Sequence, residues 1–257
     1  MNILCEIIIE KQIDIIAMAE CENLDVEAVI GYLRIQGYTM KVVEVCPENN
    51  DIKVLARDNI MISTKEENKR FSTYQIYYKD DLILLSVLHL ESGLFKEENA
   101  RNHRAGRISK QIEKIEDEVY GENERKGIVI GDFNLQPYSD GIVNVFAFNA
   151  TMSESKAKKL YRNIDNEKCW FYFNPIWKLM GDNTLVQGSY YNSEDAQDKS
   201  IYWYAYDAVL LRPYFIDKFN WDKFQYVSKT EKHSLLNSET INKKDYSDHL
   251  PIMFEIS

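Results

Sequence analysis

Apolar residues recur along the chain at two spacings, one typical of helices and one typical of strands. Residues 3–11 carry apolar side chains at helical spacing, and residues 13–19 form a compact apolar run that predicts a buried strand. A second helix is expected from Asp25, a favourable N-cap residue, through Leu33, with Gly37 near its end.

The middle of the chain alternates between strand-like and helix-like segments. Four segments rich in β-branched and aromatic residues predict strands, and they cover residues 52–56, 59–63, 74–78 and 82–90. A helix follows, because apolar residues recur on one face with charged residues between them. That face carries Ile108, Ile112, Ile115 and Val119.

The remaining pattern completes an α/β arrangement. Strands are expected at residues 127–134, 208–211 and 252–256, a helix at 153–162, and an aromatic stretch of unclear type at 169–177. Strands alternating with amphipathic helices favour a layered α/β fold, and the run of strands between 52 and 90 favours a mixed sheet. No long linker and no internal repeat interrupts the chain, so residues 1–257 are expected to form a single domain.

Composition and charge narrow the classes of function. Hydrophobic residues make up 45% and charged residues 28%, which excludes wholesale disorder. The net charge of −10, from 31 basic and 41 acidic residues, argues against an electrostatic nucleic-acid coat protein or a polybasic membrane binder. A nuclease is not excluded, because metal ions can supply positive charge locally.

The cysteines and the absence of long apolar runs indicate a cytoplasmic location. Cys5, Cys21, Cys46 and Cys169 are widely spaced and form no CxxC pair, so we expect reduced, mostly buried thiols and neither a zinc site nor a disulfide framework. No run approaches the roughly 20 apolar residues that span a bilayer, and the N-terminus does not read as a secretory signal.

Polar and ionisable side chains stand at the ends of the apolar strands, where a purely structural role is costly. Gathered at one edge of a sheet, they would form an oxygen-rich site for a hard cation such as Mg²⁺ or Mn²⁺. The residues are Glu20, His89, Asp132, Asn134, Asp207, Asp248 and His249.

The segments that carry these residues read IDIIAMAE, VLHLES, GDFNLQP, YDAVLL and SDHLPI. In that order they resemble the motifs of the endonuclease/exonuclease/phosphatase superfamily, which includes deoxyribonuclease-I-like nucleases and apurinic-site endonucleases. The resemblance covers nearly the whole chain. It implies two packed mixed β-sheets flanked by helices, a four-layer α/β/β/α sandwich, and metal-dependent cleavage of a phosphate ester.

The same resemblance assigns roles to individual residues. Glu20 matches the metal-binding glutamate of the superfamily, and Asp248 matches a metal-binding or orienting neighbour of the catalytic histidine. Asp132 and Asn134 match a pair that orients the attacking water and contacts the phosphate or the metal. These roles suit the chemistry, because a carboxylate can align a water molecule and accept its proton.

The remaining catalytic assignments concern two histidines and one aspartate. His89 matches a histidine that hydrogen-bonds a phosphate oxygen or assists the leaving group. Asp207 matches the aspartate before the penultimate core strand, and His249 matches the catalytic histidine. A histidine whose pKa lies near neutrality can donate hydrogen bonds to phosphate or move protons.

Three further residues are candidates for contact with the substrate. Arg101 and Arg104 belong to a basic run, with Arg107 and Lys110, whose spacing puts these side chains on one side of a helix. They could hold a phosphate backbone, although a solvated helix face is the favoured interpretation. The third candidate is Asn174, within an aromatic stretch that could stack bases and that core packing explains better.

The front of the chain departs from the superfamily pattern. Its members usually begin with a strand that carries an asparagine beside the metal-binding glutamate, and here only nineteen residues precede Glu20. The first strand of the fold is therefore expected to be absent. Either the sequence begins at an internal methionine or the strand has been lost, and its loss would weaken metal binding.

Three functions remain open. The first is a Mg²⁺- or Mn²⁺-dependent phosphodiesterase, a nuclease with DNA or RNA as its partner and substrate. The second is a phosphatase or phosphodiesterase that acts on a small phosphate ester or a lipid headgroup. The third is a catalytically impaired relative that serves as a binding module, which the missing strand motivates.

Overall fold

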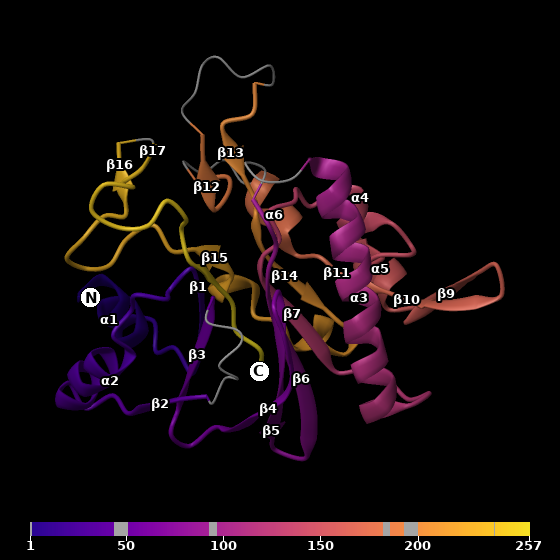
Figure 1. The fold of residues 1–257 in the computed structure, drawn as a ribbon, viewed down its shortest axis with the longest axis horizontal. Coiled ribbons are helices and arrows are strands. Elements are labelled where there is room, and N and C mark those ends of the chain that lie inside the picture. The colour runs from indigo at the N-terminus through magenta and orange to yellow at the C-terminus, as the bar shows by residue number, and fades with distance from the viewer. Residues whose placement is uncertain (1, 44–50, 93–96, 182–185, 193–199, 239) are drawn as a thin grey trace.

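Two β-sheets pack against each other and are covered on their outer faces by helices (Figure 1). The structure is a computed structural model, and it describes residues 2–43, 51–92, 97–181, 186–192, 200–238 and 240–257. This layering agrees with the expected α/β/β/α fold class, which is confirmed.

The smaller sheet has the strand order β1-β3-β2, and two helices cover its outer face. A core of Cys5, Ile8, Leu33 and Leu55 lies between these helices and the sheet. Asp25 caps the second helix, accepting a hydrogen bond from the Ala28 amide at 3.0 Å, as expected. The elements are α1 (Asn2–Glu10), β1 (Ile15–Ala19), α2 (Val26–Ile35), β2 (Met40–Val42) and β3 (Ile52–Arg57).

The larger sheet has seven strands in the order β4-β5-β6-β7-β14-β11-β8. Its central strands β6 and β7 run parallel, and β14 runs antiparallel to β7. In this register, Asp132 lies beside both His89 and Asp207, so three strand ends meet at one edge. The strands are β4 (Met61–Asn68), β5 (Phe71–Tyr78), β6 (Asp81–His89), β7 (Gly127–Asp132), β8 (Ala150–Thr151), β11 (Tyr172–Phe173) and β14 (Asp207–Leu211).

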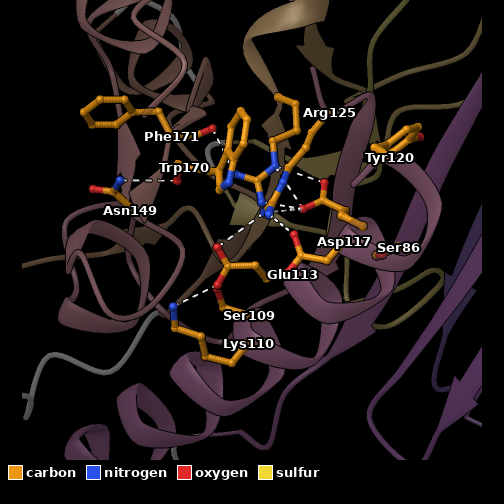
Figure 2. A network of polar contacts seen from close by, with 12 residues as sticks. Ser86, Ser109, Lys110, Glu113, Asp117, Tyr120, Arg125, Asn149, Trp170 and Phe171 are labelled. Carbon is orange, nitrogen blue, oxygen red and sulfur yellow. Dashed lines mark hydrogen bonds and ion pairs between the residues drawn. The ribbon is translucent and has the colours of Figure 1, made fainter. Parts of the chain in front are cut away.

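Helix α3 (Glu98–Tyr120) covers the outer face of the larger sheet and buries Ile108, Ile112 and Ile115, as the pattern predicted. Its Glu116 is fully buried and accepts hydrogen bonds from Arg212 Nε at 3.0 Å and from Arg125 Nη1 at 3.4 Å. Figure 2 shows this network of charged side chains between the helix and the sheet. A buried ion cluster therefore ties α3 to the end of β14.

The helix expected at residues 153–162 is wrong beyond its first turn. Only α5 (Glu154–Ala157) is helical, and the chain then forms a hairpin of β9 (Tyr161–Ile164) and β10 (Glu167–Trp170). The turn residues Asp165 and Asn166 both have positive φ, 49° and 66°, which suits a two-residue turn between antiparallel strands. This turn chemistry overrides the local helical pattern.

Several other boundaries also differ from the expectations. Strand β4 begins two residues later than expected and runs longer, while the last strand is shorter than 252–256. The aromatic stretch divides among β10, β11 and α6. The remaining elements are α4 (Asp140–Val143), α6 (Ile176–Gly181), β12 (Tyr190–Tyr191), β13 (Trp203–Tyr204), η1 (Pro213–Lys218), η2 (Trp221–Lys223), β15 (Gln225–Tyr226), β16 (Leu236–Asn237), β17 (Thr240–Ile241) and β18 (Ile252–Met253).

Strand β1 is an edge strand of the smaller sheet. Within the described ranges, no strand pairs with its outer side, so the slot expected for a first strand is not filled by another segment there. Cys5, Cys21 and Cys169 are buried free thiols, and Cys46 lies outside the described residues. No described helix is both long and apolar enough to cross a lipid bilayer.

Candidate active site

The end of β7 holds a buried carboxylate and amide in one rigid turn. Asp132 Oδ1 accepts a hydrogen bond from the Asn134 backbone amide at 2.7 Å, and Asp132 Oδ2 accepts one from Asn134 Nδ2 at 2.6 Å. Asn134 has a φ of 47°, a left-handed conformation that asparagine tolerates. Gly131 has a φ of 132°, and a Cβ there would collide with the Leu88 carbonyl oxygen of β6. The local backbone therefore requires glycine at position 131 and suits asparagine at position 134.

The start of β14 brings a second carboxylate to the same place. Asp207 pairs directly with Asp132 in antiparallel register, so the two side chains lie on one face of the sheet. His249 Nδ1 lies 2.6 Å from Asp207 Oδ2, an aspartate–histidine pair that joins residues 42 positions apart. The loop with His249 is held by a backbone bridge to Tyr190 and by the hydrogen bond from the Leu250 amide to the Ser189 carbonyl at 2.7 Å.

These residues form a close group that could hold a cation. One potential ligand atom from each of Asp132, Asp207 and His249 lies within 4.8 Å of the others. Burial, and then the negative charge of Asp207, raise the pKa of Asp132 to about 7. Burial alone would lower the pKa of His249, but its hydrogen bond with Asp207 and the nearby carboxylates raise it to about 9.

His89 and Glu20 complete the same edge. His89 is buried at the end of β6, and its Nε2 lies 3.3 Å from Glu20 Oε1 and 4.0 Å from Asp132 Oδ2. Its Nδ1 is buried with no hydrogen-bond partner within the described part of the chain. Glu20 follows β1 with a φ of 52°, and its side chain is 73% exposed. The carboxylate of Glu20 is thus accessible to a ligand.

Four of the predicted site residues have other surroundings. Asp248 is exposed and forms no hydrogen bond in the described ranges, although its charge helps to raise the pKa of His249. Arg101 donates to the Asn134 carbonyl oxygen and so supports the site from α3. Arg104 pairs with Glu91 at 3.5 Å.

Asn174 lies away from the contacts just described. It is 1% exposed, and its Oδ1 accepts a hydrogen bond from the Ile176 amide at 3.0 Å. This contact places it at the start of α6. Its hydrogen bonds among the described residues reach none of the clustered side chains, so a role with substrate stays a prediction for Asn174.

A comparison with solved structures finds proteins with a similar arrangement of strands and helices. TDP2 from Caenorhabditis elegans matches with a TM-score of 0.58 and 14% identity over 98% of this chain and 88% of that one. The 3′ phosphatase NExo from Neisseria, bound to a product DNA hairpin, matches with a TM-score of 0.54 and 11% identity over 100% and 93%. The endonuclease domain of TRAS1, a telomere-specific non-LTR retrotransposon, matches with a TM-score of 0.51 and 11% identity over 98% and 91%.

The chain has the deoxyribonuclease-I-like fold. The resemblance found in its motifs is thereby confirmed as a likeness of fold. No model of a protein family and no curated protein matches the sequence.

Sequence reasoning missed several residues that support the site in this deoxyribonuclease-I-like fold. Ser189 Oγ accepts a hydrogen bond from the Asp207 amide at 2.9 Å. The rings of Tyr190 and Tyr206 pack against the His249 ring, with centroids 5.1 Å and 6.5 Å away. Tyr206 precedes Asp207 within the YDAVLL motif and could have been singled out. Ser189 and Tyr190 lie in no motif, so only the tertiary structure reveals them.

The histidine–aspartate pair leads to a testable expectation about proton affinity. In metal-free protein, Asp207→Asn should lower the pKa of His249 by about 1 to 3 units. Burial lowers this pKa, and the ion pair with Asp207 that offsets the effect of burial would be gone. Histidine chemical shifts followed by NMR across pH 5–10 would measure this change. An Asp222→Asn variant, which changes an exposed aspartate in η2, serves as the control. An unchanged titration of His249 in Asp207→Asn would contradict the pairing.

Proposed function

We propose that the protein is a divalent-metal-dependent phosphodiesterase and that its substrate is nucleic acid. The observation that carries this proposal is the convergence of Asp132, Asp207 and His249 at one sheet edge, with ligand atoms within 4.8 Å of one another. His89 and Asn134 border the same group. Such an arrangement provides both oxygen ligands and proton-transfer groups at one point.

The donor set fits Mg²⁺ or Mn²⁺, which prefer carboxylate oxygens. Beyond the effect of burial, the negative charge of Asp207 raises the pKa of Asp132, and the charge of Glu20 adds to this effect. A cation between these carboxylates would relieve that repulsion. We propose that Asp132, Asp207 and Glu20 hold the ion and that Asp248 contributes from the exposed side. When bound, the cation would neutralise charge that builds on the phosphate oxygens.

The protein's own side chains supply the remaining steps in this proposal. In the metal-free protein, despite burial, the hydrogen bond with Asp207 and the nearby carboxylates raise the pKa of His249 to about 9, and in its protonated form His249 can donate a proton to a phosphate oxygen or to the leaving group. Asp207 orients the His249 ring through Nδ1. Asn134 holds Asp132 in place by two hydrogen bonds, and His89 can donate a hydrogen bond to phosphate from the other side.

Aromatic rings beside His249 support nucleic acid as the substrate. These rings belong to the hairpin of β12 and β13 and to the residues just before β14. One of them, Tyr202, is 39% exposed. Bases of any sequence can stack on such rings. Two of the solved structures with this fold are themselves an endonuclease domain and a phosphatase bound to DNA. The rings are Tyr190, Tyr191, Tyr202, Trp203, Tyr204 and Tyr206.

The experiment that tests this proposal is a metal-dependence assay on a panel of substrates. End-labelled single- and double-stranded DNA and RNA are incubated with the protein and either Mg²⁺, Mn²⁺ or EDTA. We expect shortened products with a metal ion, no products with EDTA, and recovery when excess metal is restored. Phosphate release from inositol phosphates without nucleic-acid cleavage would instead favour the small-ester function. If neither nucleic acids nor inositol phosphates are hydrolysed under any metal condition, the result would favour the binding-module function.

A further inference from the structure

A cavity of about 1010 Å³ lies between the β4–β5 turn and the N-terminal half of α3. None of the clustered catalytic candidates lines it. Five basic side chains line the cavity against two acidic ones, so its walls carry a local excess of positive charge on a chain whose net charge is −10. The charged lining residues are Lys69, Arg70, Arg104, Arg107, Lys110, Glu91 and Asp140.

This arginine-lined cavity lies next to the edge of the sheet that holds the candidate active site. The His89 amide donates to the Arg70 carbonyl oxygen at 3.0 Å, and the Leu90 amide donates to the Asp132 carbonyl oxygen at 2.9 Å. Glu91 of the cavity wall follows Leu90 directly. Since neighbouring strands lie about 4.8 Å apart, the cavity begins roughly one strand beyond His89. A chain molecule at the active site could therefore extend into the cavity.

Helix α3 lines the cavity and also reaches the active site. Its Arg101 contacts the Asn134 carbonyl oxygen, and Arg104 and Arg107 follow at intervals of three residues along the same helix. In Figure 1, α3 begins at the end of the molecule that carries the β12–β13 hairpin. The basic run on α3 thus begins at the active site with Arg101 and continues into the cavity with Arg104 and Arg107.

Two of the three arginines of the cavity are held in place by a shared carboxylate, and the third is free to meet an anion. Glu91, whose side chain is 12% exposed, pairs with Arg70 at 3.4 Å and with Arg104 at 3.5 Å. One carboxylate cannot neutralise two guanidinium groups, and each guanidinium carries five N–H donors. Arg107 is exposed and has no ion-pair partner within the described ranges. Such forked donors match phosphate oxygens, and the half-exposed ring of Phe146 adds a surface for stacking.

We propose that this cavity binds backbone phosphates of the same nucleic-acid strand whose phosphodiester lies at the active site. The proposal rests on the proposed function, because it extends the substrate of that site. It replaces the interpretation of the basic run as a solvated helix face. The cavity would hold the strand on the His89 side of the cleaved bond and would favour substrates that extend several nucleotides in that direction.

The test compares two charge reversals on the same helix. Arg107→Glu changes a residue of the cavity, and Lys114→Glu changes an exposed lysine of α3 outside it. Binding of a 5′-fluorescein oligothymidylate 12-mer is followed by fluorescence anisotropy in EDTA, so that no cleavage occurs. We expect Arg107→Glu to raise the Kd about tenfold and to reduce the slope of log K against log salt by about 0.7, with less than a twofold change for Lys114→Glu.

Two further measurements separate this proposal from the proposed function. An uncharged peptide nucleic acid 12-mer of the same bases should not bind, because it has no phosphates. Hydrolysis of bis(p-nitrophenyl) phosphate with Mn²⁺ needs only the metal site and should be equal in the wild type and Arg107→Glu. Absence of that hydrolysis in the wild type would refute the proposed function, while the anisotropy would still report on the cavity. Equal weakening by both charge reversals, no weakening by either, or tight binding of the uncharged oligomer would overturn the proposal.

Discussion

An Asp132→Asn variant is expected to hydrolyse phosphodiesters at least about 10²- to 10³-fold more slowly than the wild type at saturating metal. Asp132 is 8% exposed and faces both Asp207 and His89. The substitution removes one of the negative charges that would hold the cation. In the wild type, the backbone amide and Nδ2 of Asn134 donate to the two carboxylate oxygens of Asp132. The substitution places an amide nitrogen, which cannot accept, opposite one of these donors. Loss of charge and loss of orientation thus act together.

The measurement is the initial rate of oligonucleotide cleavage across a range of Mg²⁺ or Mn²⁺ concentrations. Asp222→Asn, which makes the same chemical change at an exposed position, should keep the wild-type rate. His249→Ala should lose about 10²- to 10⁴-fold, the usual contribution of a proton-transfer group. Full activity in Asp132→Asn would show that the clustered carboxylates are not the catalytic centre.

A Glu116→Gln variant is expected to destabilise the protein by about 3–5 kcal/mol, because it leaves the buried Arg212 without its ion-pair partner and removes one of the three carboxylates around Arg125. Glu116 is fully buried, and Arg212 and Arg125 are 2% and 3% exposed. Figure 2 shows the polar contacts around Arg125. The guanidinium of Arg212 also lies 3.6 Å from the ring centroid of Tyr172 and donates to the Phe171 carbonyl at 3.1 Å. These contacts hold Arg212 in the interior after its partner is neutralised.

The free energy of unfolding in urea, with circular dichroism as the signal, measures this effect. Glu118→Gln on the same helix is the matched control, because its side chain is 52% exposed and lies 3.9 Å from Lys65. We expect that control to change the stability by no more than about 0.5 kcal/mol. Equal stability of the two variants would mean that the buried cluster contributes little net free energy. The catalytic rate per folded molecule should be unchanged in both.

The sequence predicted the positions of the strand-end side chains better than it predicted the shorter elements outside the central strands. The ends of β6, β7 and β14 were expected to carry His89, Asp132 and Asp207, and the structure brings all three to one edge. The positions of these residues could be predicted because a polar residue at the end of an apolar run is a local signal, and their catalytic roles remain predictions. The helix expected at 153–162 failed because the β9–β10 hairpin depends on pairing between residues on both sides of its turn.

The order of apolar and polar residues was enough to locate the central strands and the side chains at their ends. Hydrophobic spacing acts over a few residues, so it is readable without knowledge of the fold. The pairing of residues that are distant along the chain became visible in the folded protein alone. Asp207 with His249 and Glu116 with Arg212 lie 42 and 96 positions apart, and the basic run on α3 faces a cavity completed by the β4–β5 turn. Sheet register and helix packing set these contacts, and no local pattern encodes either one.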